Sequence, residues 1–430
     1  MELVEKPKIL KKTIENSIVY FCIMKGCFKI KKYCKNINIT DRDLISRAVY
    51  TCIDDKYTRP DTLHMFEEYS GVKSSVILEL IKSVGKHAVY PIIETVIDGM
   101  RQELINKEII IKPIWYKEKI DPSSFKIRRI GIQDVKQQIY DYIAVEGLSP
   151  FFCRIGEYQY ASIKGRGQIK GVNIIKRWMR NKNIRYAGKA DIRKCYESIS
   201  KRQIMRFLKK HIKNDLLLWL INKLISTFEF GLSIGSYLSQ FLCNLYMSQL
   251  YHEISENMCR VRKHRDGTSE RVNLVKHVIF YMDDILILGT NAKDVHKAMD
   301  MIIKFADKKL GLVIKQSWTV FMTKIEDKKN DAGQFIDMMG FRIYRWHVTI
   351  RRRVFKRIRR NYVRVRKMIK THKKIPLIYA RRCISYNGQI KNSDSFKFKR
   401  KYHVNEIIKV CKKVVRKYDK GKIYYRTATC

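Results

Sequence analysis

The spacing of hydrophobic positions changes several times along the chain, and each spacing predicts a different kind of element. Between 41 and 107, apolar residues recur three and four positions apart, as in SSVILELIKSV at 74–84, which is typical of amphipathic helices. Residues 108–132 instead contain two short apolar runs, IIIKPIWY and FKIRRIGI, on either side of Asp121-Pro122. These runs favour strands and loops. The patterned part of the chain therefore begins with helices and continues with a strand-rich segment.

The rest of the chain alternates between helical and strand-like periodicity. The expected elements are a helix at 133–147, a tight turn at 165–167, a strand at 185–192, a helix at 200–227, a loop and helix at 231–252, two strands within 275–289, a helix at 291–310 and a hairpin at 341–352. From 354 onward the pattern is helical and almost purely basic. Only twenty glycines and seven prolines interrupt 430 residues, which favours long helices.

Charge is the most unusual property of the composition. The chain has 89 Lys and Arg against 41 Asp and Glu, a formal net charge of +48. Such a field attracts polyanions, so nucleic acid is the expected partner and an anionic membrane surface is the weaker alternative. A hydrophobic content of 45% supplies a sizeable core, which excludes wholesale disorder. No run approaches the ~18 apolar residues of a membrane span, so no membrane partner is expected.

The N-terminal residues and the cysteines indicate the cellular compartment in which the protein is expected. The N-terminus, MELVEKPKILKK, has early acids and no apolar core of a signal peptide. The eleven cysteines are scattered without a C-x-x-C pair, which is typical of reduced thiols. A cytoplasmic location is expected.

Two adjacent acids, Asp283 and Asp284, interrupt the apolar sequence VIFYMDDILIL at 278–288. The strand-like runs around them predict a hairpin with both carboxylates at its tip. Adjacent carboxylates repel each other and are costly to bury unless a cation pairs with them, and their hard oxygens suit Mg²⁺. Taken alone, the pair is explained more simply as a solvated hairpin turn.

A third acid, Asp191, lies in KADIRKCYESI, after strand-like residues and before a helix. Alone it would be a helix cap. A strand-end acid beside a hairpin tip with two acids is, however, the arrangement that two-metal phosphoryl transfer needs. The three aspartates together therefore favour a catalytic interpretation.

Seven segments in order resemble the motifs of reverse transcriptases of the group II intron-like lineage. ADIRKCYESI, GLSIGSYLSQ and YMDD resemble motifs A, B and C. The outer segments resemble two finger motifs and motifs D and E; they are RRIGIQDVKQQI (128–139), YASIKGRGQIKG (160–171), LGLVIKQSW (310–318) and IDMMGFRI (336–343). The resemblance covers about residues 105–345 and a thumb-like tail.

The resemblance implies an α+β fold of the right-hand polymerase type, in which an antiparallel palm sheet carries the three aspartates. The implied regions are a helical N-terminal extension at 1–104, part of the fingers at 105–185, a palm with interleaved finger segments at 186–345 and a basic helical thumb at 346–430. The implied activity is RNA-directed DNA polymerisation, a nucleotidyl transfer. It uses an RNA template and dNTPs, yields cDNA and depends on two Mg²⁺ ions, for which Mn²⁺ substitutes.

Motif B distinguishes this chain from most relatives. It reads Ile234-Gly235 and Ser239-Gln240 where most relatives have Q-G and S-P. This form resembles defence-associated reverse transcriptases, which copy a cognate structured non-coding RNA to block phage, and those of diversity-generating retroelements. The long segment before Asp191 favours the defence group. A non-catalytic RNA-binding protein on a polymerase scaffold is a further alternative, against which the intact aspartates speak.

The resemblance also implies roles for single residues. Asp191, Asp283 and Asp284 would be the catalytic acids and metal ligands, and the carbonyl of Ile192 would complete a metal shell. Tyr196, five residues after Asp191, would be the steric gate that selects deoxynucleotides. The implied nucleotide-binding residues are Arg128, Arg166, Tyr196, Ile234, Gly235, Gln240 and Lys315, with Lys126 and Arg129 as alternatives to the first two.

The C-terminal part adds a primer grip and a nucleic-acid surface. Met339, Gly340 and Phe341 match the grip that holds the primer end. The residues of the basic helix expected to contact phosphates are Arg351, Arg352, Arg353, Lys356, Arg357 and Arg360. The alternative is an ordinary solvated helix, but such a face normally carries both signs of charge.

Overall fold

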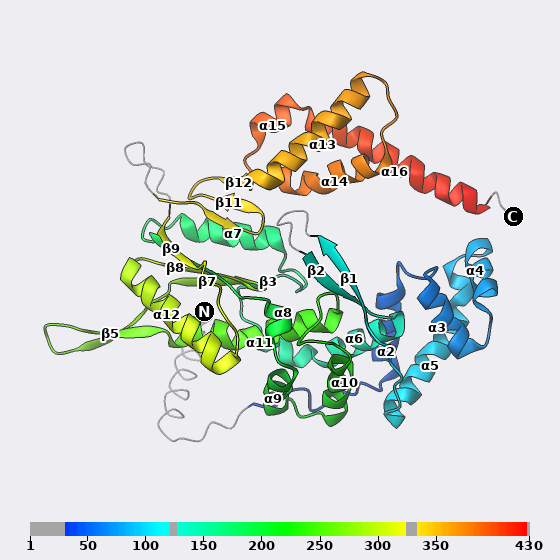
Figure 1. The fold of residues 1–430 in the computed structure, drawn as a ribbon, viewed down its shortest axis with the longest axis horizontal. Coiled ribbons are helices and arrows are strands. Elements are labelled where there is room, and N and C mark those ends of the chain that lie inside the picture. The colour runs from blue at the N-terminus through cyan, green and yellow to red at the C-terminus, as the bar shows by residue number, and fades with distance from the viewer. Residues whose placement is uncertain (1–30, 121–126, 324–332, 428–430) are drawn as a thin grey trace, which may run out of the picture.

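The computed structural model describes residues 31–120, 127–323 and 333–427, with side chains as far as Tyr418 (Figure 1). Lys126, one of the alternative nucleotide-binding residues, lies outside these ranges. None of the helices in the described ranges combines the length and the apolar composition that crossing a bilayer requires.

Helices form the N-terminal extension and confirm the prediction for 41–107. They are α2 (Arg42–Ile53), α3 (Pro60–Ser70), α4 (Ser74–Ser83), η1 (Lys86–Val89) and α5 (Tyr90–Asn106). The Asp41 side chain caps α2 by accepting a hydrogen bond from the Asp43 N–H. Gly71 ends α3 in the left-handed conformation. The extension packs on the following helix α6 (Val135–Gly147) and shares its core.

The fingers begin with an antiparallel ribbon of β1 (Trp115–Ile120) and β2 (Ile127–Ile132), as predicted for 108–132. The helix predicted at 133–147 is α6. The remaining finger segments are η2 (Ser149–Arg154), β3 (Gln159–Tyr160) and α7 (Gln168–Met179). The predicted turn at 165–167 is present, and Gly165 has a φ of +76° there.

A five-stranded sheet in the order β3-β7-β8-β4-β9 forms the palm. Its longer strands are β4 (Tyr186–Asp191), β7 (His277–Tyr281), β8 (Asp284–Gly289) and β9 (Thr319–Met322). All neighbours are antiparallel except β3 and β7. The predicted antiparallel palm sheet is therefore confirmed, and with the helices around it the fold is α+β.

Helices surround the palm sheet, and one prediction about these helices was wrong. The helices are α8 (Cys195–Ser198), α9 (Lys201–His211), α10 (Asp215–Ser226), α11 (Tyr237–His252) and α12 (Ala292–Leu310). Of these, α11 and α12 pack on strands of the sheet. The single helix expected at 200–227 is divided into α9 and α10. Ile212 between them is extended and pairs with Tyr33, and the Asn214 side chain caps the N-terminus of α10. A strand-like partner distant in sequence thus overrides the local helical pattern.

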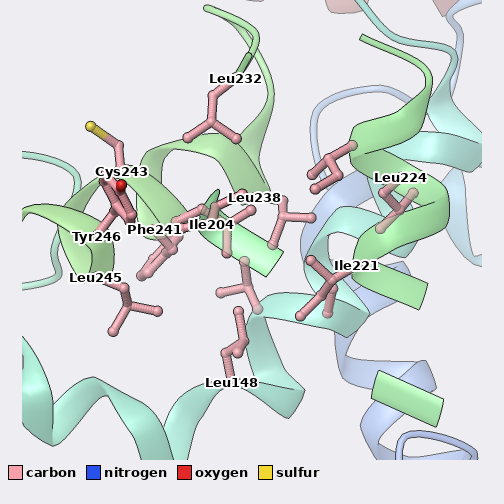
Figure 2. Packing of buried hydrophobic residues seen from close by; sticks show 14 of the residues in the cluster. Leu148, Ile204, Ile221, Leu224, Leu232, Leu238, Phe241, Cys243, Leu245 and Tyr246 are labelled. Carbon is pink, nitrogen blue, oxygen red and sulfur yellow. The ribbon is translucent and has the colours of Figure 1, made fainter. Parts of the chain in front are cut away.

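The side chains of these helices meet beneath the palm. Figure 2 shows Ile204 of α9, Ile221 of α10 and Leu238 of α11 gathered near Leu148 at the end of α6. All four are fully buried. These four side chains join finger and palm helices in one core. The core holds α9 and α10, which lie between α8 and α11, in place.

Two further parts complete the fold. η3 (Glu253–Asn257) and a ribbon of β5 (Cys259–Lys263) and β6 (Ser269–Asn273), which the sequence did not predict, follow α11. The C-terminal part consists of β10 (Ile336–Met338), β11 (Phe341–Ile343), β12 (Val348–Ile350), α13 (Arg352–Lys370), α14 (Leu377–Lys391), α15 (Phe396–Lys401) and α16 (Val404–Thr427). The predicted hairpin is β11–β12, and the helices pack around a second core with it.

Candidate active site

The register of the palm sheet brings the three aspartates together. Asp191 at the end of β4 lies directly opposite Asp284 at the start of β8. Asp284 also pairs with Tyr281, so Met282 and Asp283 form a two-residue turn in which Met282 has a φ of +55°. The Ile192 N–H donates to the Asp283 carbonyl at 3.2 Å. The three carboxylates therefore meet at one end of the central strand pair.

Burial and mutual repulsion perturb these acids. Burial raises the pKa of Asp283 to about 6, and the negative charges of Asp191 and Asp284 add to this effect. Burial also raises the pKa of Asp284, against the opposing positive charge of Lys189. A site that resists holding several negative charges is one that gains from a bound cation.

Two lysines supply positive charge to the acids. The Lys315 ammonium forms an ion pair with Asp191 Oδ2, and the Lys315 N–H donates to the Asp191 carbonyl at 2.8 Å. Lys189 precedes Asp191 by two residues in β4 and therefore lies on the same face of the strand. Its ammonium donates to the Asp337 carbonyl at 2.6 Å. Sequence reasoning placed Lys315 near the site but missed Lys189, although strand alternation was the available signal.

The donor chemistry of the acids fits divalent cations. Asp191 Oδ1 is buried and has no hydrogen-bond partner, while Oδ2 is held by Lys315. Carboxylate oxygens are the ligands that Mg²⁺ prefers. Across the described ranges, no three His, Cys, Asp or Glu side chains are spaced as a preformed metal site. The acids are thus gathered but not closed into a ligand shell, and the role of Ile192 stays a prediction.

Tyr196 lies beside the catalytic turn. Its hydroxyl contacts Met282 Sδ at 3.7 Å, and burial raises its pKa. The Tyr196 carbonyl accepts a hydrogen bond from the Leu232 N–H at 2.8 Å, which ties motif A to the loop of motif B. The structure therefore brings the expected gate residue to the acids and to the motif B loop.

The motif B loop docks on the fingers through its glycine. The Gly131 N–H in β2 donates to the Ile234 carbonyl at 2.9 Å. Gly235 has a φ of +117°, and a Cβ there would lie 2.5 Å from the Gly131 carbonyl oxygen. The close approach that requires glycine is thus to β2, and the nucleotide-binding role that the resemblance implies for Gly235 stays a prediction. Ile234 is half-buried, and the side chain of Gln240 at the start of α11 is also half-buried.

A buried acid that sequence reasoning missed anchors the same loop. Asp141 in α6 is fully buried, and its Oδ2 accepts hydrogen bonds from Ser236 Oγ at 2.7 Å and from the Leu238 N–H at 3.3 Å. Ser236 in turn caps α11 by accepting from the Ser239 N–H at 3.1 Å. Burial raises the pKa of Asp141 to about 6. No signal in the sequence distinguished this acid from a solvated helical residue.

Strand alternation separates the candidate arginines of β2. Arg128 and Arg129 point to opposite faces of the ribbon. Arg129 pairs with Glu229 at 2.7 Å and stacks on the Tyr116 ring, so its guanidinium is committed within the protein. Arg128 shares its face with Lys117 and Lys119 of β1. In the second finger motif, Arg166 Nη1 donates to the Gly156 carbonyl at 2.5 Å. The nucleotide-binding roles of Arg128 and Arg166 stay predictions.

The predicted primer grip is a tight turn between β10 and β11. Met339 and Gly340 have positive φ values of +53° and +78°. The Met339 and Phe341 side chains are buried, and the Gln168 side chain of α7 donates to the Met339 carbonyl. Gly340 is half-buried, and its carbonyl accepts a hydrogen bond from the Arg351 N–H at 3.0 Å, so the role of this turn as a primer grip stays a prediction.

Basic residues line a groove at the base of α13, next to this turn. Arg351 Nε pairs with Asp337 Oδ1 at 2.6 Å, so this arginine has a structural partner. Arg352, Arg353 and Lys356 are exposed and line the groove with it. The expected residues Arg357 and Arg360 follow on the same helix, Arg357 half-buried and Arg360 exposed.

The comparison with known proteins agrees with this site. No curated protein matches the chain. The family model described as reverse transcriptase (RNA-dependent DNA polymerase) matches residues 117–397, more than half of the chain. The match spans the three aspartates, the motif B loop, the β10–β11 turn and the base of α13. With acids, fingers and sheet arranged as in a right-hand polymerase, the chain belongs to the reverse transcriptase family.

Proposed function

We propose that the protein adds deoxynucleotides to a cDNA on an RNA template at Asp191, Asp283 and Asp284. The observation that carries this proposal is the register of β4 and β8, which sets Asp191 opposite Asp284 with Asp283 in the adjoining turn. In the reaction the primer 3′-hydroxyl loses its proton to solvent, its oxygen bonds to the α-phosphorus, the bond from that phosphorus to the oxygen bridging to the β-phosphate breaks, and pyrophosphate leaves. Two divalent ions bound at these acids, Mg²⁺ or Mn²⁺, would activate the 3′-hydroxyl and neutralise the pyrophosphate.

The residues around the acids have defined tasks in this proposal. Lys315 neutralises Asp191 until a cation binds there, and its ammonium is then free to face the incoming phosphates. Tyr196 closes the sugar side of the site beside Met282. Arg128 and Arg166 bind the triphosphate, because guanidinium groups match phosphate geometry. Positioning and charge neutralisation supply most of the rate.

Primer extension with labelled dNTPs on an RNA template tests the activity. The double variant Asp283→Asn/Asp284→Asn should abolish incorporation, because it removes two of the three acidic ligands. Asp300→Asn is the matched control, since Asp300 is an exposed acid of α12. Equal incorporation by the double variant and the wild type would refute the catalytic assignment.

We further propose that the template is a cognate structured non-coding RNA and that the cDNA serves antiphage defence. The motif B form Ile234-Gly235 with Ser239-Gln240 and the long segment before Asp191 support this choice. Sequencing the RNA and DNA that copurify with the protein is the test, together with phage plating on cells that carry the wild type or the double variant. A product that matches a variable repeat of a neighbouring gene would instead favour a diversity-generating retroelement.

A further inference from the structure

The β5–β6 ribbon projects from the palm and has no role in the site described above. It is inserted between η3 and β7 and extends away from the body of the protein (Figure 1). Its base is closed by a hydrogen bond from the Leu274 N–H to the Met258 carbonyl at 3.0 Å, and both side chains are buried. From Val261 to Arg271 every residue is exposed. An isolated two-stranded ribbon is marginally stable in water, which suggests that a partner covers it.

The register divides the ribbon into two faces. Residues opposite each other in an antiparallel pair share a face, and faces alternate along each strand. Val261 opposite Arg271 and Lys263 opposite Ser269 lie on one face, which we name the Val261 face. Arg260 opposite Val272 and Arg262 opposite Glu270 lie on the other.

The acids of the ribbon are engaged away from the Val261 face. Glu270 lies on the opposite face and pairs with His264 at 3.5 Å. Asp266 is in the turn, where its Oδ1 accepts hydrogen bonds from the Thr268 N–H and hydroxyl at 2.9 and 2.6 Å. The Val261 face thus has only cationic charge.

Contacts at the base of the ribbon preserve this asymmetry. Arg260 on the other face pairs with Asp294 of α12 at 3.0 Å. Glu256 lies in η3, outside the ribbon; its carbonyl accepts a hydrogen bond from Arg271 at 3.4 Å, and its carboxylate contacts His252 Nδ1 at 2.5 Å. Arg271 Nε contacts Cys259 Sγ at 2.7 Å, which holds the guanidinium along the strand. The charges of the opposite face balance, because Arg260 is paired with Asp294 and Arg262 lies directly opposite Glu270. On the Val261 face, Lys263 and Arg271 flank the 65% exposed Val261.

The ribbon lies at the far end of the palm sheet from the acids. Asp284 begins β8, and Leu288 near its other end accepts a hydrogen bond from the Lys276 N–H at the base of the ribbon. Four residues of an antiparallel strand span about 14 Å. A ligand on the ribbon is therefore beyond the primer terminus and the incoming nucleotide.

We propose that the Val261 face is a docking surface for the phosphates of a structured RNA, outside the segment being copied. The inference rests on the proposed function, because an RNA template long enough to be structured must continue past the active site. The unbalanced positive charge selects a polyanion, and contact with phosphates requires no particular sequence. The ribbon is thereby an anchor for the template RNA and not part of the catalytic machinery.

A pair of matched charge reversals tests the proposal. Lys263→Glu and Arg262→Glu make the same change of charge at neighbouring positions on opposite faces. Binding of an RNA stem–loop is measured over a range of salt concentrations. Lys263→Glu should weaken binding roughly tenfold and lower the log–log salt slope by about 0.7–0.9 for each lost phosphate contact, with a much smaller effect of Arg262→Glu. Equal effects of the two variants would overturn the assignment to this face.

A trimmed variant keeps the proposal testable if a reversal disturbs the ribbon. Residues 259–273 are replaced by Asn-Gly, which closes a two-residue turn between Met258 and Leu274. Binding of the stem–loop should fall, while extension of a short RNA–DNA primer–template stays at the wild-type rate. Unchanged stem–loop binding, or an equal loss of binding to a DNA duplex of the same length, would overturn the RNA assignment. A wild type that extends no primer would refute the proposed function, while the binding comparison still reports on the ribbon.

Discussion

Tyr196 illustrates how a single ring acquires its role from its surroundings. Its hydroxyl contacts Met282 in the turn of the acids, and its carbonyl holds the motif B loop. The aromatic ring is thus held between the acids and the motif B loop. A fixed ring excludes a 2′-hydroxyl by shape, without any need for the phenolic group.

We therefore expect Tyr196→Ala to admit ribonucleotides and Tyr196→Phe to retain discrimination. Removing the ring opens the space of the sugar hydroxyl, whereas removing only the phenolic oxygen leaves that space closed. Single-nucleotide incorporation with rNTPs and dNTPs measures the ratio. If Tyr196→Ala discriminates as well as the wild type, the ring has only a packing role.

Asp141 is a second single residue that shapes the site, and it acts from α6 on the motif B loop. Its carboxylate accepts from Ser236 and from the Leu238 N–H, so it fixes the loop that carries Ile234 and Gly235. Asp141→Ala should raise the KM for dNTPs more than it lowers kcat, since a loosened loop weakens nucleotide binding. Gln137→Ala is the matched control, because this buried residue of α6 donates its hydrogen bond to Thr227, which lies before the motif B loop. The same KM shift in both variants would contradict a specific role of Asp141.

The buried carboxyl of Asp141 also predicts a pH dependence of stability. Burial raises its pKa from 3.8 to about 6, so the folded state binds the proton more tightly than the unfolded state does. The stabilisation from this group is present below pH 4 and is lost as the pH rises through 6, by about 2–3 kcal/mol in total. Asp141→Asn removes the titration, so its free energy of unfolding should improve relative to the wild type across this window. Denaturant unfolding between pH 4 and pH 7 measures the difference, and parallel curves would contradict the prediction.

At the scale of elements, α13 and the residue before it separate side chains that hold the fold together from exposed basic side chains that are available for binding. Its Ile358, Tyr362 and Val365 are buried in the second core. Arg351 before it is paired with Asp337, whereas Arg352 and Lys356 are exposed in the groove beside the β10–β11 turn. The exposed pair is thus better placed than Arg351 to contact nucleic-acid phosphates.

Replacing Arg352 and Lys356 by Gln should weaken binding of a primer–template and flatten its salt dependence. Each lost phosphate contact lowers the log–log slope by about 0.9 on duplex. The control is Lys412→Gln/Lys413→Gln, which removes two exposed charges from α16. A slope that changes equally in both variants would indicate a general effect of net charge.

At the scale of the whole molecule, the N-terminal extension is part of the main core. Lys136 of α6 pairs with Glu68 at 3.1 Å and Glu103 at 2.9 Å, and Glu103 also accepts from the Tyr69 and Tyr140 hydroxyls. Apolar faces of α2 and α5 belong to the same cluster as the palm helices. The extension therefore supports α6, which in turn holds the motif B loop.

A chain truncated before Glu108 should consequently fail to fold cooperatively. Its α6 would expose Val135, Ile139 and Ile143, all fully buried in the complete protein. Calorimetric melting of the truncated and full-length proteins measures this. A truncated protein with the melting transition of the full chain would show instead that residues 1–107 are dispensable for folding.

The aspartates illustrate what could be read from the chain itself. VIFYMDDILIL and KADIRKCYESI carry their acids at strand ends, and the short apolar runs around Asp283 and Asp284 are a local pattern typical of buried strands. The helices of 41–107 and α12 followed from periodicity for the same reason. The order and spacing of the motifs were then sufficient to predict the palm and its three acids.

Contacts between distant segments were decided only by the tertiary structure. Tyr33 breaks the helix predicted at 200–227, Gly235 meets Gly131, and Lys315 pairs with Asp191, each across more than a hundred residues. Asp141 and Lys189 were not recognised, because an acid in a helix and a lysine in a strand are usually solvated. Sequence by itself thus determined most of the elements and the three acids they carry. Packing decided which cations, loops and buried carboxyls surround them, because those contacts depend on the relative placement of elements that no local pattern encodes.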